Sequence, residues 1–413
     1  MKITDNIPQG YKNSPLGIIP QEWEVKKLGD ITEINPSKEE ISSQFVTFLT
    51  MSDVSEHGGV IKENIMPKSS IKPGLTSFKR GDIIIAKITP CFENGKGALL
   101  NNITCEYGFG STEFHVIRYR QCNKFIYYHT MSYAFRKRLE SQMTGSAGQK
   151  RVPADSISSY KIPVPSLSEQ QKIAEILSTW DKAIEKQMQL IEKFELRKKG
   201  LMQQLLTGKK RLPGFSGEWK KVKFSSIIEK MSNGYVYDTN NTGDIPITRI
   251  ETISKGNIDY SKVGFIQYVG ELEKYKLRKG DILFSHINSI AHIGKVAMFD
   301  GNKDLYHGMN LLLIRAKEII NKNYLYYFLS STIARRKVRN FAKQAVNQAS
   351  VNTDELKKWF LCIPEIEEQS AIAQILAETD QEIIFYQEKL KLLRQQKRGL
   401  MQQLLTGKKR IKI

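Results

Sequence analysis

The sequence has 413 residues, which is long for one hydrophobic core and predicts two to four domains. Lys and Arg number 63 against 43 Asp and Glu, and the net charge of +20 favours a polyanionic partner such as DNA, RNA or a membrane surface. The chain has no apolar run of about 18 residues and no apolar signal core after Met1, so neither a membrane span nor a secretory signal is expected.

The first predicted domain covers residues 1–165, where short apolar runs alternate with Gly, Asn and Asp. Ile83–Ala86 and Phe114–Ile117 are rich in residues that favour strands. Phe125–Arg138 predicts a helix with aromatic residues at its start and basic residues at its end. The mixture predicts an α+β domain with a mainly β core.

A long helix is predicted over residues 166–209. From Ile173 to Leu205, apolar residues recur at alternating steps of four and three, which is a heptad pattern of about five repeats. Thr-Gly-Lys-Lys-Arg, ending at Arg211, predicts the end of the helix. Lys198 interrupts the apolar positions; we interpret it as a solvated side chain, with an acidic contact from a partner as the alternative.

Two capping boxes compete for the start of this helix. Ser166 has Glu169 three residues later, and Ser168 has Gln171 at the same spacing. The sequence does not choose between them.

The second predicted domain, residues 210–364, repeats this order. Ile282–Phe284 and Leu311–Ile314 predict strands, and Tyr324–Arg339 predicts a helix. A second long helix follows over residues 365–413, with the same heptad pattern and with Lys397 at the same interruption.

The two halves are copies of one unit. Gly200–Arg211 and Gly399–Arg410 are identical over twelve residues at an offset of 199. The same offset aligns further pairs: Glu169-Gln170 with Glu368-Gln369, Gly81-Asp82-Ile83 with Gly280-Asp281-Ile282, and Gly95-Lys96 with Gly294-Lys295. Val54–Ser77 and Ile253–Lys276 diverge. The shared segments therefore predict a common scaffold, and the divergent segments predict different tasks.

The predicted fold class follows from the length of the helices. A helix of about 38 residues is roughly 57 Å long and cannot bury its apolar stripe alone. The chain must run out along the first helix and return along the second, which favours an antiparallel pair within the chain. The alternatives are packing of each helix on its own domain or a homodimeric coiled coil. We predict an α+β fold class, with two pseudo-repeated globular domains (1–165 and 210–364) separated by two long antiparallel coiled-coil helices (166–209 and 365–413).

Several kinds of chemistry are not expected. The sequence contains neither a phosphate-binding P-loop nor a dinucleotide-binding glycine motif after a strand. The histidines lack the spacing of a metal site, so neither a metal nor a cofactor nor a catalytic residue is predicted. The four cysteines are scattered and predict reduced thiols of a cytoplasmic protein.

Three repeated motifs carry a resemblance to a known family. Pro165–Ala174 and Pro364–Ala373 share Pro-x-x-x-Glu-Gln-x-x-Ile-Ala, the identical block contains Gly-Leu-Met-Gln-Gln-Leu-Leu-Thr-Gly, and Ile19–Trp23 has Ile-Pro-x-x-Trp. With these motifs the chain resembles, over essentially its whole length, the specificity (S) subunits of Type I restriction-modification systems. Phe215–Trp219, the second counterpart of Ile19–Trp23, lacks the Ile-Pro.

The resemblance implies a non-catalytic subunit that recognises double-stranded DNA. Each domain would read one half of an asymmetric bipartite site, and the helices would set the spacer between the half-sites. The helices would also bind two methyltransferase (modification) subunits, and restriction subunits would join the full complex. A stand-alone architectural or regulatory DNA-binding protein is the alternative, and it would not need identical glutamines outside the apolar seam.

Candidate contacts are chosen by residue type. Polar and basic side chains on loops predict DNA contacts at Lys87, Lys96, Gln149, Lys150, Arg151, Arg249, His286, Asn288, Lys295, Asn347 and Gln348. The basic segments Arg136-Lys137-Arg138 and Arg335-Arg336-Lys337 are candidates for phosphate contacts, with a solvated helix face as the alternative. The repeated glutamines Gln203, Gln204, Gln402 and Gln403 lie off the heptad seam and are predicted to contact the modification subunits.

Overall fold

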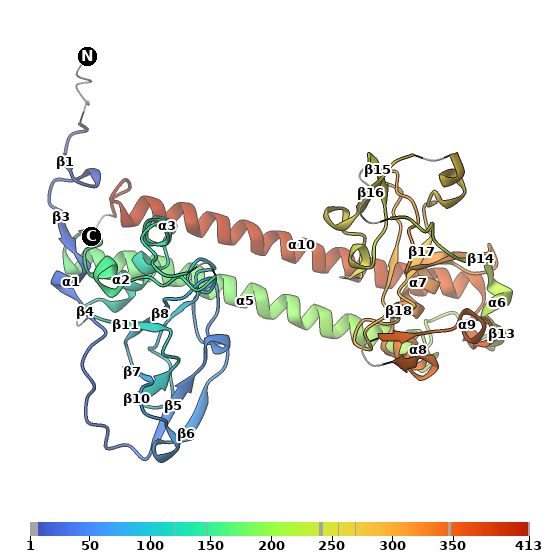
Figure 1. The fold of residues 1–413 in the computed structure, drawn as a ribbon, viewed down its shortest axis with the longest axis horizontal. Coiled ribbons are helices and arrows are strands. Elements are labelled where there is room, and N and C mark those ends of the chain that lie inside the picture. The colour runs from blue at the N-terminus through green and yellow to red at the C-terminus, as the bar shows by residue number, and fades with distance from the viewer. Residues whose placement is uncertain are drawn as a thin grey trace. The chain divides into compact units, whose positions relative to one another are not determined.

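The computed structural model describes residues 7–119, 121–146, 148–238, 243–254, 256–268, 270–345 and 348–411, without the side chains of residues 344, 345 and 348. The chain divides into two compact units, Met1–Gln187 with Lys389–Ile413, and Met188–Glu388. Each unit holds one globular α+β part and a segment of each of two long helices, α5 (Leu167–Leu205) and α10 (Ile366–Leu405) (Figure 1). Within the described ranges, none of the helices is apolar over a stretch long enough to cross a membrane.

The first unit contains two four-stranded sheets. The first has the order β4 (Glu33–Ile34), β11 (Phe114–Arg118), β8 (Ile83–Ala86) and β9 (Gly97–Leu99), and all its pairs are antiparallel. The second has the order β6 (Asn64–Pro67), β5 (Phe45–Leu49), β10 (Tyr107–Gly110) and β7 (Thr76–Lys79), with β10 parallel to β5. Two ribbons pair β1 (Tyr11–Ser14) with β2 (Gly17–Pro20), and β3 (Glu24–Lys27) with β12 (Lys161–Val164).

The helices of the first unit join its sheet to the long helices. They are α1 (Leu28–Ile31), α2 (Asn123–Thr130), α3 (Tyr133–Glu140) and α4 (Ala154–Ser158). The largest core cluster of this unit contains Ile83 of β8, Phe125 of α2, Leu177 of α5 and Leu404 of α10, all of them buried. The globular part and both helix segments therefore share one core.

The second unit contains counterparts of the first unit's antiparallel sheet (β4, β11, β8 and β9) and of its ribbon of β3 and β12. Its four-stranded sheet has the order β14 (Ile228–Asn233), β20 (Leu312–Ala316), β17 (Ile282–Phe284) and β19 (Val296–Met298). Three smaller sheets pair β13 (Lys220–Lys223) with β23 (Phe360–Ile363), β15 (Ile245–Ile247) with β16 (Gly264–Ile266), and β18 (Ile287–Asn288) with β22 (Gln348–Ser350) and β21 (Lys343–Ala345). The helices are α6 (Phe224–Ile227), α7 (Lys322–Ser330), α8 (Thr332–Phe341) and α9 (Thr353–Lys358).

The shared and divergent segments differ in structure as the repeat predicts. Asp82 and Asp281 follow glycines with φ of +92° and +96°, and each immediately precedes a central strand of its unit, β8 or β17. By contrast, Val54–Ser77 contributes a strand to the four-stranded second sheet, whereas Ile253–Lys276 forms β16 and short 3₁₀ helices. The divergent segments therefore build different structures on a common scaffold.

The α+β class and the predicted central strands are confirmed, but each predicted basic helix is two helices. Phe125–Arg138 is divided between α2 and α3, and Tyr324–Arg339 between α7 and α8. Ser132 and Ser331 cause the breaks, because their hydroxyls accept hydrogen bonds from the backbone N–H groups of Phe135 and Ala334 and so cap new helices.

Within each unit the two long helices run antiparallel. In the second unit the ring of Phe194 stacks on Tyr386 with centroids 4.9 Å apart, and Lys198 pairs with Asp380, so the partner number falls as the number along α5 rises. The start of α5 uses the first of the two competing capping residues, because the N–H of Glu169 donates to the hydroxyl of Ser166 at 3.4 Å.

The interpretation of Lys198 and Lys397 as solvated side chains was wrong. The ammonium of Lys198 lies 2.5 Å from a carboxylate oxygen of Asp380, which also accepts a hydrogen bond from the Tyr327 hydroxyl at 2.9 Å. In the first unit Lys397 pairs with Asp181, which accepts from a tyrosine hydroxyl in the same way. Each lysine also faces the ring of its tyrosine, at 5.6 and 5.2 Å. These Tyr–Asp–Lys clusters join each globular part to both helices.

Candidate nucleic-acid and partner interfaces

A cluster of Trp23, Glu169 and Arg410, here the first Trp–Glu–Arg cluster, connects the globular part of the first unit to both long helices. The Glu169 carboxylate is almost completely buried and accepts from the indole of Trp23 at 3.0 Å. It also accepts two hydrogen bonds from the guanidinium of Arg410, at 2.9 and 3.2 Å. This hydrogen bonding raises the pKa of Arg410 and keeps the guanidinium charged.

The second unit repeats this arrangement with Trp219, Glu368 and Arg211. Glu368 accepts from Trp219 at 3.3 Å and from two nitrogens of Arg211 at 2.7 Å each. Gly208 has φ of +70°, and a Cβ there would lie 3.3 Å from the ring of Trp219. The glycine and the arginine of the repeated Thr-Gly-Lys-Lys-Arg are therefore explained by the helix end and by this cluster.

The first candidate DNA loop is formed by two segments that the fold brings together. Ile88 pairs with Arg151 in an isolated bridge, so Lys87 lies near the exposed residues Gln149 and Lys150. Arg151 is exposed, but its guanidinium already donates three hydrogen bonds to the carboxylate of Glu113, the shortest at 2.8 Å. This pairing raises the pKa of Arg151.

The second candidate loop repeats the same register at an offset of 199. Ile287 of β18 pairs with Ser350 of β22, and this places half-buried Asn288 beside the strand that begins at Gln348. His286 is buried, and burial lowers its pKa, so its imidazole is neutral at pH 7 and is not at the surface. Asn347 and the side chain of Gln348 lie outside the described part of the chain.

Two predicted DNA contacts are partly engaged by the protein itself. The ammonium groups of Lys96 and Lys295 donate to the backbone carbonyls of Met51 and Ser254, at 2.9 and 2.5 Å. These two bonds hold neighbouring loops in place and explain why the two lysines recur. Arg249 is half-buried beside Gly264, and its buried Nε has no hydrogen-bond partner among the described residues.

The two basic helices differ in exposure. Arg136 of α3 is buried and donates to the carbonyls of Thr130 and Phe92, at 2.9 and 3.1 Å, so the interpretation of this residue as a phosphate contact or a solvated side chain was wrong. Lys137 and Arg138 are exposed. On α8, Arg336 and Lys337 are exposed and Arg335 is half-buried.

The repeated glutamines lie on the surface near the ends of both long helices. Gln203 and Gln204 are exposed on α5, and Gln402 and Gln403 are exposed on α10. Leu205 and Leu404, which lie next to them, are buried. The identical glutamines are therefore not required by packing within the unit.

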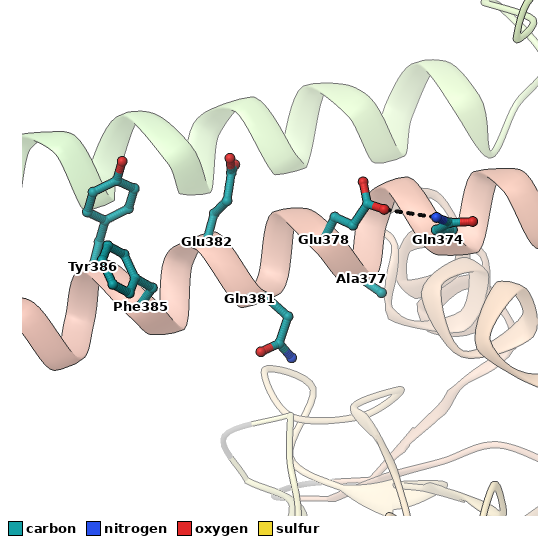
Figure 2. A pocket seen from close by; sticks show the side chains of 7 residues that line it. All are labelled: Gln374, Ala377, Glu378, Gln381, Glu382, Phe385 and Tyr386. Atoms are coloured by element: carbon teal, nitrogen blue, oxygen red, sulfur yellow. Dashed lines mark hydrogen bonds between the residues drawn. The ribbon is translucent and has the colours of Figure 1, made fainter.

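A groove of about 570 Å³ lies along another part of α10, within the second unit. Figure 2 shows its seven lining residues: Gln374, Ala377, Glu378, Gln381, Glu382, Phe385 and Tyr386. The Gln374 amide donates to the Glu378 carboxylate at 3.0 Å, and the Phe385 ring is 61% exposed. None of the four repeated glutamines lines this groove.

Comparison with known proteins places the sequence in a family. The family model described as the type I restriction modification DNA specificity domain matches twice, over residues 20–195 and 216–395. The chain belongs to this specificity-domain family. Each match includes one globular part and most of one long helix.

Three curated relatives match different shares of this chain. The putative MjaX specificity subunit of Methanocaldococcus jannaschii is 41% identical over 46% of this chain and 46% of its own length. The EcoAI specificity subunit of Escherichia coli is 42% identical over 38% of this chain and 27% of its own length. The chain therefore matches less than half of the length of these two relatives. The MjaVIII specificity subunit of M. jannaschii is 24% identical over 95% of this chain and 94% of its own length.

Solved structures share the fold of this specificity-domain chain. A chain from a structure of a type I R-M system has a TM-score of 0.60 at 18% identity, covering 94% of this chain and 99% of that chain. The S subunit of a type I restriction-modification system from M. genitalium has a TM-score of 0.54 at 13% identity, covering 98% of each chain.

The repeated motifs of this chain include residues of the Trp–Glu–Arg clusters. In Pro-x-x-x-Glu-Gln the glutamate accepts from Trp and Arg, while the amide of Gln170 or Gln369 donates to the carbonyl of the preceding proline, at 3.0 and 2.9 Å. The sequence-based prediction did not find this role for Glu169 or Arg410. The recurrence of both residues at an offset of 199 was the available signal.

Proposed function

We propose that this chain is the DNA sequence-specificity subunit of a type I restriction-modification complex. Each unit would read one half of an asymmetric, bipartite site in double-stranded DNA. The observation that carries the proposal is the repeat of one scaffold with divergent segments between its shared parts, in a chain that matches the specificity-domain family twice. The stand-alone architectural or regulatory DNA-binding protein is not favoured, because it does not account for the two matches to the specificity-domain family.

The long helices support the spacing part of the proposal. Each is a continuous helix of 39 or 40 residues that begins in one compact unit and ends in the other. Such helices would fix the number of unread base pairs between the half-sites. Methyl transfer and DNA cleavage would belong to two modification subunits and to the restriction subunits, and no catalytic residue or cofactor is assigned to this chain.

The proposed compartment is the cytoplasm. All four cysteines are free thiols, as expected for a protein in a reducing compartment that contains the DNA of the cell.

Exchanging residues 1–165 for the corresponding domain of another family member should change one half of the recognised site and leave the other half unchanged. The reason is that the divergent segments of each half build a separate structure on the common scaffold. Methylome sequencing of a host with the original gene, with the exchanged gene and without the gene measures the result. New bases in both halves would contradict separable readers, and no gene-dependent bipartite motif would contradict the proposed function.

Replacing Gln203, Gln204, Gln402 and Gln403 by alanine should reduce co-purification with the modification subunit several-fold, because these exposed amides are the repeated polar groups of the helix ends. Replacing the equally exposed Gln189, Gln387, Gln395 and Gln396 on the same helices is the matched control. Equal recovery of the modification subunit with both variants would remove the repeated glutamines from the interface.

A further inference from the structure

Three cations of the second unit gather where α8 meets the loop before β19. Arg335 and Arg339 are four residues apart on α8, so they share one face of the helix. The loop lies against this helix, since a Cβ on Gly294 would be 2.9 Å from a methyl carbon of Val338. Lys295 follows this glycine. We call Lys295, Arg335 and Arg339 the cationic cluster.

The cationic cluster combines mutual repulsion with one donor on Arg335 that is unpaired in the described part of the chain, while Lys295 already donates to the carbonyl of Ser254. The Nε of Arg335 is buried and, within the described ranges, has no hydrogen-bond partner. Burial, followed by the charge of Arg339, lowers the pKa of Arg335, and burial, followed by the charge of Arg335, lowers the pKa of Lys295. Among the described residues, no carboxylate contributes to either shift. A bound anion would relieve the repulsion among the three positive charges.

In the first unit, the arginine equivalent to Arg335 is held by contacts within the protein. Arg136, the residue 199 positions before Arg335, is buried, and its guanidinium lies 4.7 Å from the ring centroid of Phe92 while donating to backbone carbonyls. Ala291 stands at the position of Phe92 in the second unit, so this ring is absent there. Arg335 therefore lacks an equivalent of the Phe92 ring, against which the guanidinium of Arg136 packs.

The third cation also differs between the units. Glu140 stands at the position of Arg339, and it pairs with Lys137 at 3.2 Å. The first unit thus neutralises its helix, whereas the second adds a positive charge at the same place.

We infer that Lys295, Arg335 and Arg339 form a binding site for a DNA backbone phosphate that is present in the second unit and absent from the corresponding place in the first. This inference rests on the proposed function, because it names an anchor for the DNA that the second unit reads. A phosphate contact carries no base information, so the site strengthens binding and fixes orientation without changing the recognised sequence. The affinity for the second half-site should consequently depend more strongly on salt concentration than the affinity for the first.

The test measures the affinity of the full chain, purified with its modification subunits, for a duplex with the motif found by methylome sequencing. Arg335→Gln/Arg339→Gln should reduce the magnitude of the slope of log K against log salt by about 0.9 for each phosphate that the protein no longer neutralises. The ratio of affinities for the cognate duplex and for duplexes with one changed base should stay the same. Arg339→Glu, which places the charge of Glu140 at an exposed position, should reduce the slope without a change in a buried residue.

Lys357→Gln/Lys358→Gln is the matched control, because it removes the same charge from exposed positions of α9 in the same unit. An unchanged slope for the Arg335 and Arg339 variants, or an equal decrease for the control, would overturn the phosphate site. A wild-type complex that does not prefer the motif duplex to a shuffled duplex would instead overturn the proposed function. The two failures are therefore distinguishable.

Discussion

Replacing Arg315 by alanine is expected to lower the free energy of unfolding of the second unit by about 3–5 kcal/mol. Arg315 on β20 donates two hydrogen bonds of 2.7 Å to the carboxylate of Asp281, whose side chain is 1% exposed. Without the guanidinium, this carboxylate would remain buried with the backbone N–H of Arg278 as a donor. Denaturant titration with hydrogen exchange of peptides from β17 and β20 measures the decrease in stability.

Two control variants distinguish the effect of breaking the Arg315–Asp281 pair from the effect of a general loss of charge. Asp281→Ala/Arg315→Ala should be less destabilised than the sum of the two single variants, because neither charge is left buried alone. Lys276→Ala removes one partner of an ion pair of 2.8 Å in the same unit, but both side chains are exposed and screened by solvent, so only a small loss of stability is expected. The assignment fails if Arg315→Ala costs no more than Lys276→Ala.

The sequence predicts the scaffold well because the scaffold depends on periodic and repeated signals. The heptad pattern of the long helices and the apolar runs at Ile83–Ala86 and Ile282–Phe284 depend on which residues are buried, and that is a local property of the chain. The antiparallel pairing follows from connectivity, since one chain must return along its second helix.

The sequence does not predict contacts between residues that are far apart in the chain. Lys397 interrupts a heptad pattern, but its partner Asp181 lies on the other helix, and no local signal connects them. Arg136 and Arg335 occupy equivalent positions in two basic helices, yet one is a buried structural residue and the other is not. The difference comes from the presence or absence of the Phe92 ring, which is about 40 residues earlier in the chain and reaches α3 only through the fold.

The choice of candidate DNA contacts from the sequence is likewise limited, because exposure depends on the fold. Residue type alone nominated Gln149 and Lys150, which are exposed, but also His286, which is buried. Bridges at Ile88–Arg151 and Ile287–Ser350 bring the nominated segments of each unit together, and this proximity comes from the fold and was not predicted from the sequence. The divergent loops have no common code that would assign bases to residues, and the base contacts remain a prediction.

Acid is expected to destabilise the first unit through His129 of α2. The imidazole is buried with its ring 4.7 Å from that of Phe125, and burial lowers its pKa to about 3, against about 6.5 in an unfolded chain. Below pH 6.5 the unfolded state therefore binds a proton that the folded state does not bind. The stability from this residue is complete above pH 6.5, and it falls by about 1.4 kcal/mol per pH unit until the pH approaches 3.

His129→Phe isolates this contribution, because it removes the titrating group and keeps an aromatic ring against Phe125. Other groups titrate equally in both proteins, so the difference in the free energy of unfolding of the first unit should change by about 2 kcal/mol between pH 6.5 and pH 4.5, in favour of the variant at low pH. His307, whose pKa burial lowers to about 4, is a buried histidine of the second unit at a position that is not equivalent to His129. His307→Phe should change the acid dependence of the second unit alone, as measured by hydrogen exchange at each pH. Parallel stability curves for wild type and His129→Phe would show that His129 is protonated in the folded state, and its burial would then not be the cause of acid sensitivity.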